Sequence, residues 1–261
     1  MRAVALGMVL LCGIAQGAEP NSIGMELIEI PAGEFMMGSP LDEQYHCDNE
    51  KQVAVTLTKP FWLGKTEVTQ GQFKKVMGTK PWRSWAVKGD KDCPATYVSW
   101  EEAKAFCDEL TELDEDAGKL KANEKYSLPT EAQWEYACRA GTTTAYSFAD
   151  DPWGGEYAWF HGNAMNAGEK YAHKVGLKKP NPWGLYDMHG NVSEWCSDWK
   201  GEKLSGGTDP VGPEGGSARV ARGGSWRSFP ALGRSANRFS GVPKESRGTL
   251  GFRVARSQSA Q

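Results

Sequence analysis

The sequence predicts an α+β fold rich in ordered loops, with two main helices and small antiparallel sheets. Two capped amphipathic segments lie near the middle of the chain, and short alternating segments precede them. No long periodic segment follows Gly141. The 261 residues include 31 Gly, 14 Pro and 11 Trp, a composition typical of many turns around large aromatic rings. We expect residues 20–261 to form one domain, because no linker or internal repeat divides them.

Residues 1–17 have the pattern of a signal peptide. Arg2 precedes an apolar run over residues 3–15, and small residues at Ala15 and Gly17 suit signal-peptidase cleavage. A short membrane anchor is the alternative, but the run is shorter than the roughly 20 residues that a span needs. We therefore expect an exported protein, periplasmic or secreted, with no membrane span after cleavage. The net charge of −3 excludes a strong general attraction to nucleic acid.

Five cysteines remain once the signal segment is removed, and they are widely spaced: Cys47, Cys93, Cys107, Cys138 and Cys196. An odd number leaves at least one without a partner in its own chain. The absence of a C-x-x-C pair argues against a zinc site. Disulfides and buried thiols are both open interpretations.

The first half of the chain predicts strands and then helices. Residues 25–39 and 53–69 alternate like short strands, and a short helix follows, capped by Thr69 with Gln72 and ended by Gly78. A longer helix begins after Ser99, with Glu102 completing a capping box. We expect its buried face to carry Trp100, Ala103, Phe106, Cys107 and Leu110, and residues 111–125 to form a solvated excursion.

A third helical segment has Thr130 and Gln133 as its capping box and ends at Gly141. After it, strand candidates occur only near residues 219–222 and 250–255. Because tryptophans recur through this half, we expect its loops to be held in place by aromatic packing rather than disordered.

Residues 181–199, NPWGLYDMHGNVSEWCSDW, concentrate oxygen ligands among glycines. Asp187, Asn191, Glu194 and Asp198 supply hard oxygens, and the glycines allow backbone carbonyls to turn inward. Calcium prefers such a mixture, although the spacing is not that of an EF-hand. A tight turn whose acids bond to loop amides is the alternative.

Residues 219–238, RVARGGSWRSFPALGRSANR, contain five arginines but no Cys, His, Asp or Glu. The arginines suit either a groove for an anionic or peptide partner or structural ion pairs with the chain's 33 acidic residues. The predicted groove residues are Ser225, Trp226, Arg227, Arg234 and Arg238.

Seven ordered motifs resemble the formylglycine-generating-enzyme, or sulfatase-modifying-factor, family. They are MELIEIPAGEFMMGS, LGKTEVTQGQF, PATYVSWEEAKAFC, YSLPTEAQWEYACRAG, NPWGLYDMHGNVSEWCSDW, RVARGGSW and GTLGFRVA, spread over residues 24 to 255. The resemblance implies a C-type-lectin-like fold. It also implies calcium held at Asp187 and Glu194, with the carbonyls of Gly190 and Val192. A second family calcium site would begin at Ala158 and Trp159 and is expected to be lost or rebuilt here.

The family's enzymes use oxygen to convert a sulfatase cysteine to formylglycine. They hold copper(I) between two cysteines just after the Gly-Gly-Ser turn, and the two positions fall at Ser228 and at or near Gly233. No cysteine follows Cys196, so a thiolate pair suited to copper(I) is absent from this region of the sequence. Copper is therefore not expected, and no catalytic residue is assigned at Ser225, Ser228 or Gly233.

The family's two core disulfides would join Cys107 and Cys138 to positions near Val254 and Ser235. We expect these two thiols to be free and buried, or differently paired.

Two functions follow from the resemblance. The first is a calcium-stabilised binding or regulatory module for a peptide or protein partner outside the cytoplasm. The second is an oxygen-dependent oxidoreductase of the formylglycine-generating class, acting on a sulfatase cysteine or a peptide siderophore by a non-copper route.

Overall fold

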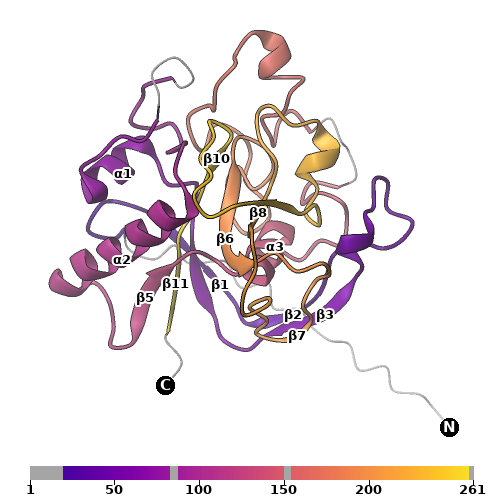
Figure 1. The fold of residues 1–261 in the computed structure, drawn as a ribbon, viewed down its shortest axis with the longest axis horizontal. Coiled ribbons are helices and arrows are strands. Elements are labelled where there is room, and N and C mark those ends of the chain that lie inside the picture. Colours follow the sequence, from indigo (N-terminus) through magenta and orange to yellow (C-terminus); the bar gives the residue numbers. More distant parts are fainter. Residues whose placement is uncertain (1–19, 83–87, 150–153, 259–261) are drawn as a thin grey trace, which may run out of the picture.

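The computed structural model describes residues 20–82, 88–149 and 154–258 (Figure 1). The predicted signal segment, residues 1–17, lies outside the described residues. Within these ranges, none of the helices has the length and apolar character that crossing a bilayer requires.

Three small sheets carry the fold. The first joins the beginning and end of the described chain in one antiparallel sheet of order β1-β4-β11-β5. Its strands are β1 (Leu27–Ile30), β4 (Phe61–Gly64), β11 (Ala255–Gln258) and β5 (Glu124–Ser127).

The second sheet has the order β10-β6-β8-β9, and the third has the order β2-β3-β7. Both were expected to be antiparallel, but β10 runs parallel to β6 and β7 runs parallel to β3. Neither pair of strands is consecutive in the chain, so no hairpin turn forces them to run antiparallel. The bounds are β6 (Ser193–Trp199), β8 (Arg219–Arg222), β9 (Phe239–Gly241), β10 (Leu250–Gly251), β2 (Gly33–Met37), β3 (Val53–Leu57) and β7 (Gly207–Thr208).

The three predicted helices are confirmed as α1 (Gln70–Met77), α2 (Trp100–Asp116) and α3 (Glu131–Arg139). Each begins with the predicted capping box, so side chains satisfy amide groups that the first helical turn leaves free. The remaining helical turns are 3-10 in type: η1 (Asp48–Glu50), η2 (Met165–Ala167) and η3 (Pro230–Gly233).

Two predicted boundaries were wrong. Residues 111–125 were expected to form a solvated excursion, but the helix α2 continues to Asp116. Asp114 is buried there and accepts a 2.6 Å hydrogen bond from the Tyr126 hydroxyl, which anchors this turn to β5. Helix α3 ends at Arg139, before the expected Gly141, because Ala140 already adopts the left-handed conformation with φ of 47°.

The strand β6 was not predicted, because its acidic residues favoured a loop at residues 193–199. In the structure both acids are buried with partners, Glu194 beside Arg253 and Asp198 beside the amide of Glu131. β6 lies next to α3 and β8 in the middle of the molecule (Figure 1).

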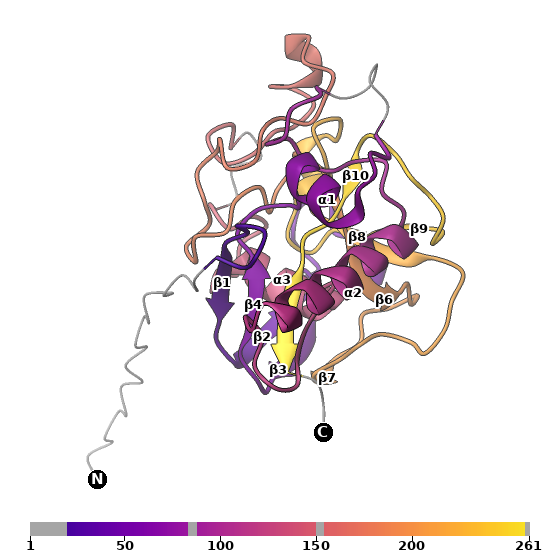
Figure 2. The same cartoon turned by 90° about the vertical axis from the view of Figure 1, so that its left-hand side faces the viewer.

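Two hydrophobic clusters form most of the core. One surrounds Trp134 of α3 and packs α3 against β2, β3 and β4. The other lies beneath α1 and α2, where Phe73, Phe106 and Phe252 contact one another with ring centroids 5.3 to 6.3 Å apart. The helices α1 and α2 therefore cover one side of the molecule (Figure 2).

The loop-rich half gathers at the end of the molecule opposite β3 and β7, where η2 and η3 lie (Figures 1 and 2). Trp226 and Trp159 pack there with Ala164, Ala172 and Val192. Aromatic packing thus holds these described loops together, as the tryptophan content predicts.

Candidate functional site

The loop after β8 begins with a turn that only glycine suits. Gly223 and Gly224 have φ angles of 90° and 72°. A Cβ on Gly223 would lie 3.1 Å from the Trp134 ring and 3.2 Å from the Met188 carbonyl. This turn directs Ser225 and the following residues along the outside of the core.

Ser228 lies at the first of the two positions that the resemblance implies for copper. Its Oγ accepts a 3.1 Å hydrogen bond from the Ser225 amide and lies 3.1 Å from the Ser225 hydroxyl. The Ser228 carbonyl accepts a hydrogen bond of 2.9 Å from the His161 amide. Ser228 therefore closes the turn instead of offering a soft metal ligand.

Gly233 lies at or near the second position that the resemblance implies for copper, and the structure leaves no room for a side chain there. A Cβ would lie 2.4 Å from Cε1 and 2.7 Å from Cζ of Phe160. The Gly233 carbonyl accepts a 2.7 Å hydrogen bond from His189 Nδ1. The residues at these two positions therefore do not fit a copper(I) site of the family's kind.

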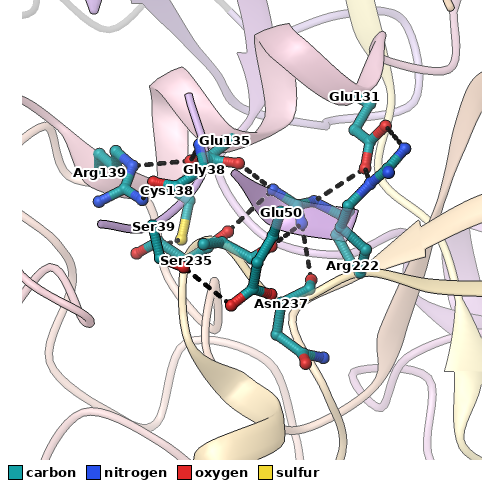
Figure 3. A network of polar contacts seen from close by, with 12 residues as sticks. Gly38, Ser39, Glu50, Glu131, Glu135, Cys138, Arg139, Arg222, Ser235 and Asn237 are labelled. Atoms are coloured by element: carbon teal, nitrogen blue, oxygen red, sulfur yellow. Dashed lines mark hydrogen bonds and ion pairs between the residues drawn. The ribbon is translucent and has the colours of Figure 1, made fainter. Parts of the chain in front are cut away.

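The cysteines of the described residues are all free thiols, and Cys47 alone among them is exposed. Cys138 lies 3.7 Å from the Ser235 hydroxyl, measured from Sγ to Oγ, and both residues are buried (Figure 3). The serine thus stands beside the thiol where the resemblance places a disulfide partner. Burial raises the pKa of Cys138 to about 12, which keeps it a thiol at neutral pH.

Two predicted groove residues, Arg234 and Arg238, are buried in ion pairs. Arg238 holds the Glu131 carboxylate through hydrogen bonds of 2.6 and 2.7 Å. Arg234 donates to Glu43 at 2.5 Å and to Glu50 at 2.7 Å. These two arginines therefore have the structural role that the sequence left open as the alternative.

The other three arginines of residues 219–238 differ in their surroundings. Arg222 is fully buried and bonds the Glu135 carboxylate and the carbonyls of Ala236 and Asn237 (Figure 3). The guanidinium of Arg219 lies between two indole rings, 3.7 Å from Trp100 and 3.5 Å from Trp199. Arg227 is exposed.

We call residues 225–233 the display loop, because its outer side presents Arg227 with two exposed apolar side chains. Phe229 is 63% exposed and Leu232 is 40% exposed. The His161 ring stacks on Phe229 with centroids 4.8 Å apart. Trp226, predicted to line a groove, is an anchor instead: it is buried, and its indole donates to the Gly248 carbonyl.

Sequence reasoning missed Phe229, Leu232 and His161 as surface residues. The available signal was a pair of large apolar residues around Pro230 in a loop otherwise rich in polar and small residues. Such exposed apolar side chains mark interaction surfaces when they lie together.

The two predicted carboxylate ligands of calcium differ in how fully other groups already bond them. Glu194 lies at the start of β6, where its carboxylate accepts hydrogen bonds from Arg253 at 2.6 Å and from the Trp134 indole at 2.7 Å. Asp187 has φ of 57° and accepts a 2.7 Å bond from the Gly176 amide through Oδ2.

Asp187 Oδ1 and Glu67 Oε2 are buried, and neither has a hydrogen-bond partner among the described residues. Burial raises the pKa of Asp187 to about 6. Burial, and then the charges of Asp187 and Glu194, raise the pKa of Glu67 well above its usual range. Sequence reasoning missed Glu67, because it lies 120 residues earlier in the chain than Asp187.

These free carboxylate oxygens fit a hard cation such as calcium. Within the described ranges, no three His, Cys, Asp or Glu side chains are grouped closely enough to hold a metal alone. An ion at this place would therefore depend on backbone carbonyls as well, as the resemblance implies for Gly190 and Val192.

The second calcium position of the family does not fit. The Ala158 carbonyl accepts a 2.8 Å bond from Asn163, and the Trp159 carbonyl accepts one of 3.0 Å from the Asn191 amide. The ammonium of Lys178 lies 3.8 Å from the Trp159 ring centre and bonds the Gly155 carbonyl.

Fold and site together define a lectin-like α+β domain with a glycine-serine turn and no thiol pair beside it. The chain belongs to the sulfatase-modifying factor enzyme 1-like domain family, whose description matches residues 16–258. It is 30% identical to a formylglycine-generating enzyme of Streptomyces coelicolor, over 87% of this chain and 88% of that protein.

Two further similarities bear on function. The chain is 33% identical to a chaperone protein, LppX, of Paenibacillus barcinonensis, over 67% of this chain and 71% of that protein. The solved structure of PvdO from Pseudomonas aeruginosa superposes with a TM-score of 0.80 at 27% identity, covering 93% of this chain and 98% of that one.

Proposed function

We propose that this protein is an exported binding or regulatory module that holds a peptide or protein partner at its display loop. The closed position at Gly233 carries this proposal. With Phe160 filling that space and Ser228 bonded to Ser225, the loop retains the family's backbone turn without its copper ligands.

The exposed side of the display loop has the chemistry of a recognition surface. The Arg227 guanidinium suits a carboxylate, and Phe229 and Leu232 offer apolar area beside it. Trp226 anchors the start of the display loop through the hydrogen bond from its indole to the Gly248 carbonyl. Arg234, the residue after the loop, holds the other end by donating from Nε to the Ala231 carbonyl. Because the loop is held in place before binding, little ordering entropy opposes association. The preferred partner segment carries an acidic group next to apolar side chains.

The similarity to a chaperone protein supports a function in holding other proteins. The buried ion pairs of Arg234 and Arg238 support it as well. They fix the segment next to the display loop from its inner side and leave the outer side of the loop free for a partner.

Calcium stabilises this module in our proposal. Asp187 and Glu67 would hold it through the oxygens left unpartnered among the described residues, with the carbonyls of Gly190 and Val192, while Glu194 stays bound to Arg253 beside them. The ion would compensate two buried carboxylates that no group among the described residues neutralises directly.

A capture experiment tests the binding function. Immobilised mature protein is incubated with envelope extract, and bound proteins are quantified by mass spectrometry. We expect at least one protein retained by the wild type to be lost with Arg227→Ala or Phe229→Ala. The matched control is Lys80→Ala, which removes an exposed positive charge elsewhere on the surface. Equal capture by wild type and both loop variants would contradict the proposal.

Oxidation of a peptide is the second candidate function. Near full-length similarity to a formylglycine-generating enzyme, and to PvdO in structure, favours it. The substrate would be a sulfatase cysteine or a peptide siderophore, and the route would not use copper held by cysteines. Incubation with copper(I), oxygen and a peptide containing Cys-x-Pro-x-Arg provides the test. A mass loss at that cysteine, absent when the protein is left out, would establish catalysis and refute a binding-only function.

A further inference from the structure

A cavity of about 390 Å³ lies beside the end of the display loop. Its walls come from residues 40–45, between β2 and η1, and from residues 143–146, which follow α3. Arg234, the residue after η3, forms part of its lining. The volume lies within the range of roughly 300 to 1,000 Å³ that is common for sites that take small groups.

The charge of this cavity is negative. Asp42 and Glu43 line it, and Arg234 is its one cationic lining residue among those described. Arg234 is already matched by two carboxylates, because its Nη1 donates to both Glu43 and Glu50. In the described part of the chain Asp42 has no ion-pair partner and is exposed. An anionic ligand would therefore be repelled here, and a cation would be attracted.

The remaining lining adds one exposed aromatic ring and hydroxyl groups. Tyr45 is 59% exposed, and its carbonyl accepts a 2.7 Å hydrogen bond from Arg234 Nη2. Thr143, Thr144 and Tyr146 also line the cavity, but Tyr146 is buried and its ring stacks on Phe148. An aromatic face such as that of Tyr45, beside carboxylates, attracts ammonium and guanidinium groups, and hydroxyls accept their hydrogen bonds.

The position of the cavity relates it to the display loop. Arg234 directly follows Gly233, the last residue of that loop, and its Nε donates to the Ala231 carbonyl within η3. The exposed Leu232 lies in the same short turn. A peptide that contacts Phe229 and Leu232 therefore reaches the mouth of the cavity within a few residues.

We propose that this cavity binds the ammonium or guanidinium group of a lysine or arginine side chain in the partner peptide. The inference deepens the proposed function and rests on it for the identity of the partner, but cation binding in the cavity is testable by itself. The partner segment then combines an acidic and apolar part at the display loop with a basic side chain at the cavity.

The probe is N-acetyl-arginine amide, compared with its neutral isostere N-acetyl-citrulline amide. Each is titrated at low ionic strength into ¹⁵N-labelled mature protein, and backbone amide signals of residues 41–45 and 143–146 are followed by NMR. We expect saturable shifts with the arginine compound, at least fivefold weaker binding of the citrulline compound, and weaker binding as salt is added.

Asp42→Asn should weaken binding of the arginine compound about two- to fivefold, the range for one partly exposed charge pair. Asp116→Asn, an equally exposed acid on α2, should leave binding unchanged. Thermal melts of both variants check that they remain folded.

Equal binding of the two compounds, absence of shifts around the cavity, or unchanged affinity in Asp42→Asn would each overturn the inference. These outcomes differ from failure of the proposed function. Partner capture that depends on Arg227 can persist when the cavity binds no cation, and cation binding can persist when no partner is captured.

Discussion

The guanidinium of Arg253 holds the carboxylate of Glu194 through two hydrogen bonds of 2.6 Å, with both side chains buried. Arg253 also donates to the carbonyls of Gly64 and Tyr186, each at 2.9 Å. One arginine thus joins β6, the end of β4 and the loop before Asp187. Because Arg253 holds Glu194, a substitution of Glu194 would break this ion pair as well as alter the proposed calcium site.

Arg253→Met should strongly destabilise the protein, because it leaves Glu194 as a buried charge without its partner. We expect a loss of about 3–5 kcal/mol in the free energy of unfolding, measured by urea denaturation. Arg256→Met serves as the control, since that partly exposed guanidinium packs over Trp62 and should cost about 1 kcal/mol or less. Similar losses in the two variants would show that the buried pair contributes little.

Calcium should raise the melting temperature of the wild type and leave Asp187→Asn and Glu67→Gln nearly unchanged. At a calcium concentration 100 times Kd, linkage predicts about 2.7 kcal/mol of added stability. Glu194→Ala is a poor test, because it also removes the partner of Arg253. A wild-type melt that is the same in calcium and in chelator would count against the site.

The calcium effect should also depend on pH. Burial raises the pKa of Asp187 to about 6, so the calcium-free fold favours its protonated form and loses stability as pH rises from about 4 through 6. Calcium at the proposed site would bind the ionised form and reverse this loss. The difference between melts with and without calcium should therefore grow from pH 5 to pH 7.5, and a difference independent of pH would contradict the role of Asp187.

Ser235→Cys should form a disulfide with Cys138, because Sγ of that cysteine lies 3.7 Å from the Ser235 hydroxyl oxygen. The bridge would close a loop of nearly 100 residues, for which stabilisation of about 2–4 kcal/mol is typical. Thiol counting and melts with and without reductant measure it. Ser228→Cys is the control and should remain a free thiol; an unbridged Ser235→Cys protein under oxidising conditions would refute the expected geometry.

Gly233→Ala should destabilise the protein by about 1–3 kcal/mol, because its Cβ meets the Phe160 ring. The double variant with Phe160→Leu should recover part of that loss, since the smaller side chain vacates the contact. Denaturant unfolding of the single and double variants decides this. If Gly233→Ala is as stable as the wild type, the position is open and the argument against a metal ligand there fails.

Helix starts and the family framework were predictable because their causes are local. Thr69, Ser99 and Thr130 each cap a helix with a residue three positions later, so a short stretch of sequence contains the whole interaction. The absence of any cysteine after Cys196 was equally plain, since it is a matter of residue identity.

The roles of the charged residues were not predictable, because their partners are distant in the chain. Arg238 bonds Glu131, and Arg234 bonds Glu43 and Glu50, across 107 to 191 residues. A sequence pattern shows that arginines cluster. It does not show which of these arginines will form ion pairs with buried carboxylates. β6 was missed for the same reason, since its two acids are compatible with a buried strand only when those partners are present.

The sequence by itself determined the family, the helix starts and the absence of cysteine after Cys196. The tertiary structure decided which side chains are buried and which are exposed. It turned Trp226, Arg234 and Arg238 inward as anchors, left Arg227 and Phe229 outside, and set Glu67 beside Asp187. The physical reason is that burial and pairing depend on contacts between segments that only folding brings together.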